Sequence, residues 1–111
     1  MALESIHGSF VRIVYFVNLE AHPKPDSDAY GTISGAQAAC WVDTDDATVA
    51  EERARVALAD AGWDSEELEE LRPITRDDFI HSPVSLARFD QALTDGIAIT
   101  LHRWPVGAPD E

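Results

Sequence analysis

The most constraining stretch of this sequence is residues 41–63, an alanine-lined segment that lies between two tryptophans. Its small apolar residues recur with a 3.6-residue period, which places them on one face of a helix. These residues are Ala47, Ala50, Ala54, Ala57, Leu58 and Ala61. Gly62 can adopt the left-handed conformation that ends a helix. Because alanine buries little area, such a face needs a flat apolar sheet close against it. The stretch therefore predicts a helix packed on a β-sheet.

The start of this helix is marked by polar residues. Thr48 and Glu51 fit a capping box, and Asp45 is a competing N-cap. Carboxylates at 43, 45 and 46 also suit the positive end of the helix dipole.

Strand patterns flank the helix on both sides. Residues 9–19 are apolar on both faces, which predicts a strand covered on both sides, and a loop follows at 20–29. Residues 30–42 form a weaker strand that contains two glycines. Residues 96–104 alternate as a last strand, which Pro105 ends.

The remaining stretch, residues 64–75, is ambiguous. Its glutamates and leucines favour a helix, whereas Pro73 and the short spacing favour a strand. We predict a strand over 67–75, then one helical turn at 76–79 capped by Thr75. Ser82 and Pro83 start a second helix, which ends at Gly96.

These elements define an α+β fold in the order β-β-α-β-α-β. We expect a four-stranded, mainly antiparallel sheet with two helices on one face, a ferredoxin-like or related two-layer sandwich. The strand order stays open. Residues 1–111 form a single domain with flexible ends at 1–8 and 106–111. Trp41, Trp104 and the two-sided strand at 11–19 would leave an apolar face open, which predicts a homodimer.

The charge balance restricts the class of partner. Lys and Arg number 8 against 21 Asp and Glu, a net charge of −13. Such a field repels phosphate backbones and disfavours nucleic acid, but it can steer a basic protein partner. No signal-peptide pattern or membrane-length apolar run occurs, so we expect a cytoplasmic protein without membrane contact. Cys40 is the single cysteine and is predicted to be buried.

No pattern for catalysis or a cofactor is present. The four histidines show no metal-ligand spacing, and neither a GxSxG elbow nor a phosphate-binding glycine motif occurs. Asp77, Asp78 and His81 fall within one turn, so a bound cation there stays an open alternative to a solvated loop. We therefore predict that the protein is not an enzyme and binds no cofactor or metal.

A binding site is predicted at the carboxyl ends of the strands around the first helix, because the turn entering such a helix opens a crevice. The residues assigned to it are Tyr30, Asp43, Asp45, Asp46, His102 and Trp104. Its carboxylates favour a cationic group. The alternatives are that these acids only cap the helix, and that His102 only lies at a sheet end or subunit interface.

The pattern over residues 40–105 resembles that of small, uncharacterised bacterial α+β proteins. It comprises the acidic turn, the alanine helix, Ala61-Gly62-Trp63, a Glu-rich strand, Phe89-x-x-Ala92-x-x-Asp95-Gly96-Ile97 and Trp104-Pro105. The resemblance concerns packing and capping, and it implies no activity. We therefore expect a non-catalytic protein-interaction module; the alternative is a small-ligand-binding or regulatory domain that uses the open sheet face or a dimer cleft.

Overall fold

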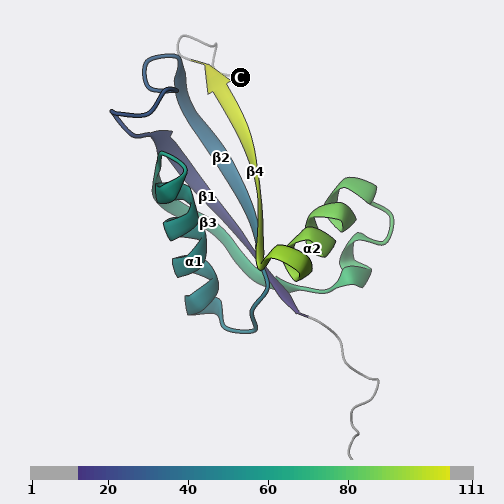
Figure 1. The fold of residues 1–111 in the computed structure, drawn as a ribbon. Coiled ribbons are helices and arrows are strands. Elements are labelled where there is room, and N and C mark those ends of the chain that lie inside the picture. The colour runs from purple at the N-terminus through teal and green to yellow at the C-terminus, as the bar shows by residue number, and fades with distance from the viewer. Residues whose placement is uncertain (1–12, 106–111) are drawn as a thin grey trace, which may run out of the picture.

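The computed structural model of the chain describes residues 13–105 (Figure 1). The predicted flexible ends at 1–8 and 106–111 lie outside the described residues. The elements in chain order are β1 (Val14–Pro23), β2 (Ile33–Val42), α1 (Ala47–Asp60), β3 (Trp63–Ile74), the 3₁₀ helix η1 (Arg76–Phe79), α2 (Pro83–Asp95) and β4 (Ile97–Pro105). No helix in this part of the chain is both long and apolar enough to span a membrane.

The four strands form one sheet in the order β3-β1-β2-β4, and every neighbouring pair is antiparallel. The predicted α+β class, the antiparallel sheet and the order β-β-α-β-α-β are confirmed. The ambiguous stretch is a strand, and it is longer than predicted because β3 pairs with β1 from Trp63 to Ile74. β3 and β4 are the two outer strands.

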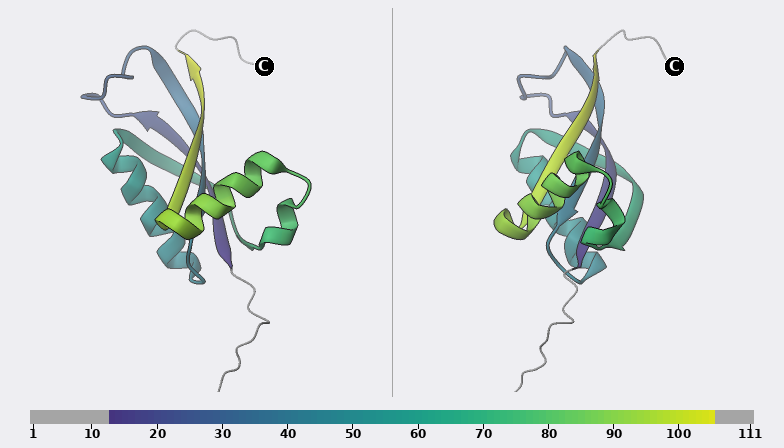
Figure 2. Two further views of the ribbon diagram at one scale, coloured as in Figure 1. Left: turned by 45° about the vertical axis from the view of Figure 1, so that its right-hand side comes forward. Right: turned by 90° about the vertical axis from the view of Figure 1, so that its right-hand side faces the viewer.

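The two helices cover opposite faces of the sheet, which corrects the prediction that they share one face (Figure 2). Val17, Leu19 and Cys40 pack against α1, on what we call the α1 face. Their sequence neighbours point the other way, because side chains alternate along a strand. Val14 and Trp41 accordingly pack against α2, on the α2 face. The arrangement is therefore not a two-layer sandwich.

The second helix covers Trp41, one of the two tryptophans that motivated the predicted dimer. Trp41 is 6% exposed within a single chain, and its ring meets that of Phe16 edge-on with centroids 5.2 Å apart. Phe89 of α2 and Ile74 of β3 lie in the same cluster. Trp41 therefore gives no reason to invoke a second subunit.

Several element boundaries differ from the predictions. β1 continues to Pro23, through part of the predicted loop, because β3 extends far enough to pair with it. β2 begins at Ile33 rather than at residue 30. Glycines with φ near +90° follow each helix, Gly62 after α1 and Gly96 after α2, as the sequence predicts.

Candidate functional site

The six residues predicted to form one binding site lie at opposite ends of the sheet. Tyr30 precedes β2 and Asp43 follows it, so the full length of that strand separates them. β4 runs antiparallel to β2 and places His102 opposite Gln37 and Trp104 opposite Gly35. His102 and Trp104 therefore lie toward the Tyr30 end, whereas the three aspartates lie at the other end. The expectation that these strand ends share a crevice is wrong.

The acidic turn caps α1. The Asp46 carboxylate accepts a hydrogen bond from the Val49 N–H at 3.1 Å, so Asp46 is the N-cap in place of Asp45 or Thr48. Thr44 Oγ1 accepts from the Asp46 N–H at 3.2 Å. The Asp43 N–H donates to the Gly96 carbonyl at 3.0 Å, which ties this turn to the start of β4.

Trp104 packs across the neighbouring strand rather than into a pocket. A Cβ placed on Gly35 would come within 3.0 Å of the Trp104 indole, so the ring occupies the space that a side chain at Gly35 would need. His102 is exposed. Neither residue lines either of the two hollows described below.

The described residues show no metal site, and their one cysteine is buried. Among residues 13–105, no group of three His, Cys, Asp or Glu side chains is placed to hold a metal ion, and Asp77, Asp78 and His81 thus form no such group. Cys40 is buried, and burial raises the pKa of its thiol to about 12. The thiol therefore stays protonated at neutral pH and is a poor nucleophile.

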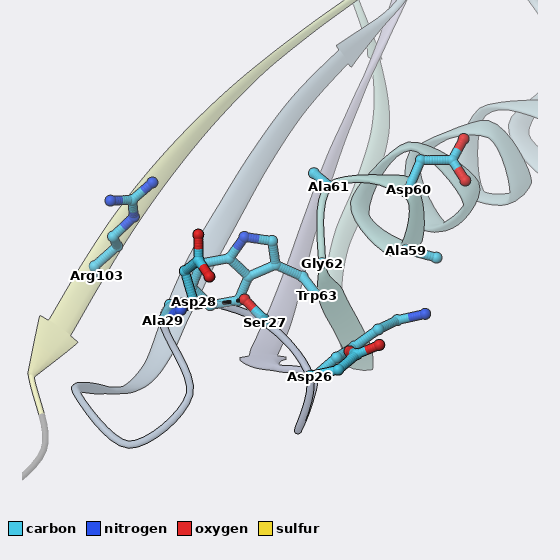
Figure 3. A pocket seen from close by; sticks show the side chains of 11 residues that line it. Asp26, Ser27, Asp28, Ala29, Ala59, Asp60, Ala61, Gly62, Trp63 and Arg103 are labelled. Carbon is cyan, nitrogen blue, oxygen red and sulfur yellow. Dashed lines mark hydrogen bonds between the residues drawn. The ribbon is translucent and has the colours of Figure 1, made fainter.

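One hollow of about 650 Å³ opens where the β1–β2 loop meets the end of α1 (Figure 3). Its floor is the Trp63 indole, which is 4% exposed, and the Arg103 guanidinium stands 5.9 Å from the ring centroid. The Lys24 N–H donates to the Gly62 carbonyl at 2.9 Å and holds the loop in place. The remaining lining residues are Asp26, Ser27, Asp28, Ala29, Ala59, Asp60 and Ala61.

A second hollow of about 470 Å³ lies between α1 and the start of β4. It is lined by Glu52, Arg53, Val56, Ala57, Asp60 and Ile97. Asp60, the last residue of α1, lines both hollows, so they meet at that end of the helix. We call these two hollows together, which reach β4 at Ile97 and at Arg103, the β4 trough. Ile99 and Leu101, the α1-face residues between its ends, are only partly buried.

The arginines around β4 differ from the others in the described chain. Arg55, Arg72 and Arg76 form ion pairs with Glu51, Glu70 and Asp90 respectively. The arginines that border β4 instead contact neutral groups. Arg53 donates to the Gly96 carbonyl at 3.2 Å, Arg88 to Thr100 Oγ1 at 3.0 Å and to Gln91, and Arg103 stands over Trp63. Within residues 13–105, none of these three has a carboxylate oxygen within 4 Å of its guanidinium nitrogens.

Sequence reasoning missed this site although part of its signal is visible. β4 carries no carboxylate, whereas β3 carries Asp64, Glu66, Glu67, Glu69 and Glu70. This difference in acid content becomes informative only when the strand order shows that β3 and β4 are the two outer strands. The trough itself arises because α1 packs over β3 and β1 and leaves the flank of β4 open.

Comparison with protein-family models, with characterised proteins and with solved structures gave no match. The resemblance over residues 40–105 thus stays a prediction.

Proposed function

We propose that this protein is a non-catalytic interaction module that binds an extended segment of another protein in the β4 trough. The observation that carries the proposal is an outer strand of nine residues, free of carboxylates, that runs beside an open trough. An outer strand presents unpaired backbone N–H and C=O groups. An extended segment can pair with these groups and place alternate side chains in the adjoining hollows.

Apolar surface along the trough supports this mode of binding. Val56 on α1 is 54% exposed, and it lies beside Ile97 in the second hollow. Ile99 and Leu101 continue the apolar α1-face row of β4. Covering these side chains would contribute favourable free energy in addition to the backbone hydrogen bonds.

The net charge of the chain predicts a basic partner. The arginines that border β4 favour an acidic segment instead. A ligand in the trough meets Arg53 and Arg103, which have no ion-pair partner among residues 13–105, beside the carboxylates that line the same hollows. The predicted homodimer is a competing use of the same strand, because two β4 strands could pair about a two-fold axis.

Selection from a random dodecapeptide display library tests the proposal. Peptides selected on the immobilised protein should protect backbone amides of β4 from hydrogen exchange, because strand addition pairs them. The variant Val56→Gln removes apolar surface from the trough and should weaken these peptides about fivefold or more. Val84→Gln is the matched control, because Val84 is 72% exposed in the first turn of α2.

Two results would count against the proposal. One is a selection that yields no peptide protecting β4. The other is equal loss of affinity in the Val56 and Val84 variants, which would place the contact elsewhere.

A small-ligand-binding function is the second candidate, because the Trp63 hollow of about 650 Å³ has the size of a metabolite site. Stabilisation of the protein by a compound from a metabolite panel, lost in Arg103→Gln but not in Val56→Gln, would favour it over peptide binding.

A further inference from the structure

We infer that the β4 trough selects an acidic extended segment, with carboxylates six positions apart and apolar residues between them. This inference rests on the proposed function, and it adds the chemistry of the partner. The inference is drawn from the position of the arginines that have no ion pair within residues 13–105, together with the apolar row that separates them.

The two ends of the trough each offer a cation. Arg103 lies at one end, where the side chain projects over the Trp63 ring and Lys24 lines the same hollow. Arg53 lies at the other end, where it donates to the Gly96 carbonyl just before β4 begins. In a chain with a net charge of −13, cations without a carboxylate within 4 Å are available to an incoming acid.

The carboxylates already in the trough form no ion pair with these arginines. Glu52 and Asp60 line it from α1, and Asp26 and Asp28 line the Trp63 hollow from the β1–β2 loop. None lies within ion-pair distance of Arg53 or Arg103. These acids instead restrict where a carboxylate of the partner is tolerated, so position as well as charge determines selectivity.

Strand geometry sets the spacing. Residues 97 and 103 lie six positions apart on β4, which corresponds to about 20 Å. An even separation keeps both positions on the α1 face. A partner strand beside β4 therefore needs acids at its first and seventh positions to reach both arginines. Its third and fifth positions lie beside Leu101 and Ile99, which favours β-branched apolar residues there. The pattern is symmetric, so it suits either strand direction.

Three capped heptapeptides test this inference. All have valine at positions three and five and threonine at positions two, four and six; glutamate, glutamine or lysine occupies both positions one and seven. The glutamate peptide should bind at least tenfold more tightly than the glutamine peptide, and it should protect β4 amides from exchange. Its affinity should fall as salt rises, whereas that of the glutamine peptide should not.

Matched arginine variants locate the contact. Arg103→Gln should weaken the glutamate peptide about tenfold and leave the glutamine peptide within twofold. Arg72→Gln is the control, because Arg72 also lies on an outer strand over an aromatic ring, 5.7 Å from the Phe16 centroid, but on β3.

The outcomes separate this inference from the proposed function. If the glutamine or lysine peptide binds as well as the glutamate peptide and protects β4, the trough binds strands but the acidic selectivity is wrong. If none of the three protects β4 while library-selected peptides do, the spacing is wrong. If no peptide of either kind protects β4, both proposals fail. Concentration-dependent self-association through β4, detected by light scattering, would make a second copy the occupant and overturn the inference.

Discussion

The two outer strands of the sheet are built in opposite ways. β3 carries exposed carboxylates at Asp64, Glu66, Glu67 and Glu69, and its register against β1 shifts between Asn18 and Ala21. β4 is acid-free over its nine residues, and its register against β2 is regular from Gly35 onward. Charge and irregular pairing are known ways to stop a strand from adding further strands. β3 therefore carries more of these protections than β4, which has only Arg103, Pro105 and a register shift between Ile33 and Gly35 at its end.

The side chains around each strand extend this difference. On β3 two of the carboxylates contact side chains of the same chain. Glu66 lies 3.3 Å from His22, and Glu69 accepts a hydrogen bond from Gln37 at 2.7 Å. Around β4 the arginines contact carbonyl, hydroxyl, amide or ring groups. A chain that protects one outer strand more heavily than the other favours binding at the less protected strand.

The largest effect is expected from Gly35→Val, a change on β2 that displaces the Trp104 side chain of β4. A Cβ at this position would lie about 3.0 Å from the Trp104 indole, so the ring must shift away from β2. We expect a loss of about 1–3 kcal/mol in the free energy of unfolding, measured by urea denaturation. Hydrogen exchange should rise at residues 102–104 and stay unchanged at 97–99. Uniform exchange along β4 would show that Trp104 does not hold this end.

An intermediate effect is expected when β3 is made to resemble β4. The triple variant Glu66→Thr, Glu67→Thr and Glu69→Thr removes charge from the protected strand and adds a β-branched residue at each position. It should self-associate with rising concentration in light scattering, because an uncharged outer strand is free to pair.

The control for this variant loses the same charge elsewhere. Asp45→Asn, Asp77→Asn and Asp95→Asn lie outside β3 and outside the β4 trough, and all three residues are exposed. If this control self-associates equally, net charge rather than the protection of β3 keeps the protein apart.

Local patterns in the sequence predicted most of the fold. The Ala50, Ala54 and Leu58 face, the Ser82-Pro83 helix start and the Gly62 and Gly96 helix ends depend on short-range geometry, and all are present. Which face each helix covers depends on long-range pairing. Phe89 and Ala92 suit either face of a sheet, so their period could not show that α2 lies opposite α1.

The candidate site could not be predicted from the sequence because it, too, depends on long-range pairing. Arg53 and Arg103 are fifty positions apart, and only the strand order β3-β1-β2-β4 brings them to one trough. The predicted site relied on the carboxyl ends of the strands lying together, which holds for parallel strands. In this antiparallel sheet β2 and β4 end on opposite sides, so Asp43 and His102 cannot share a crevice.

The smallest effect is expected at the connection that carries the chain from β3 to β4 across the α2 face. Arg76 of η1 holds Asp90 of α2 through two hydrogen bonds of 3.2 and 3.1 Å. These bonds and the charge of Arg76 lower the pKa of Asp90 below its ordinary value of 3.8. A lowered folded-state pKa stabilises the fold above the unfolded pKa, and that contribution is lost as pH falls through the folded value.

Asp90→Asn should therefore reduce the free energy of unfolding at pH 7 in low salt. The reduction should be slight because both groups are exposed. The deficit relative to the unmodified chain should disappear well below pH 3.8, and urea denaturation at both pH values measures it. Peptide affinity for the β4 trough should not change, because the pair lies over the opposite face; a loss of affinity would mean that the α2 connection shapes β4, and the contrast between the two outer strands would then depend on more than their own residues.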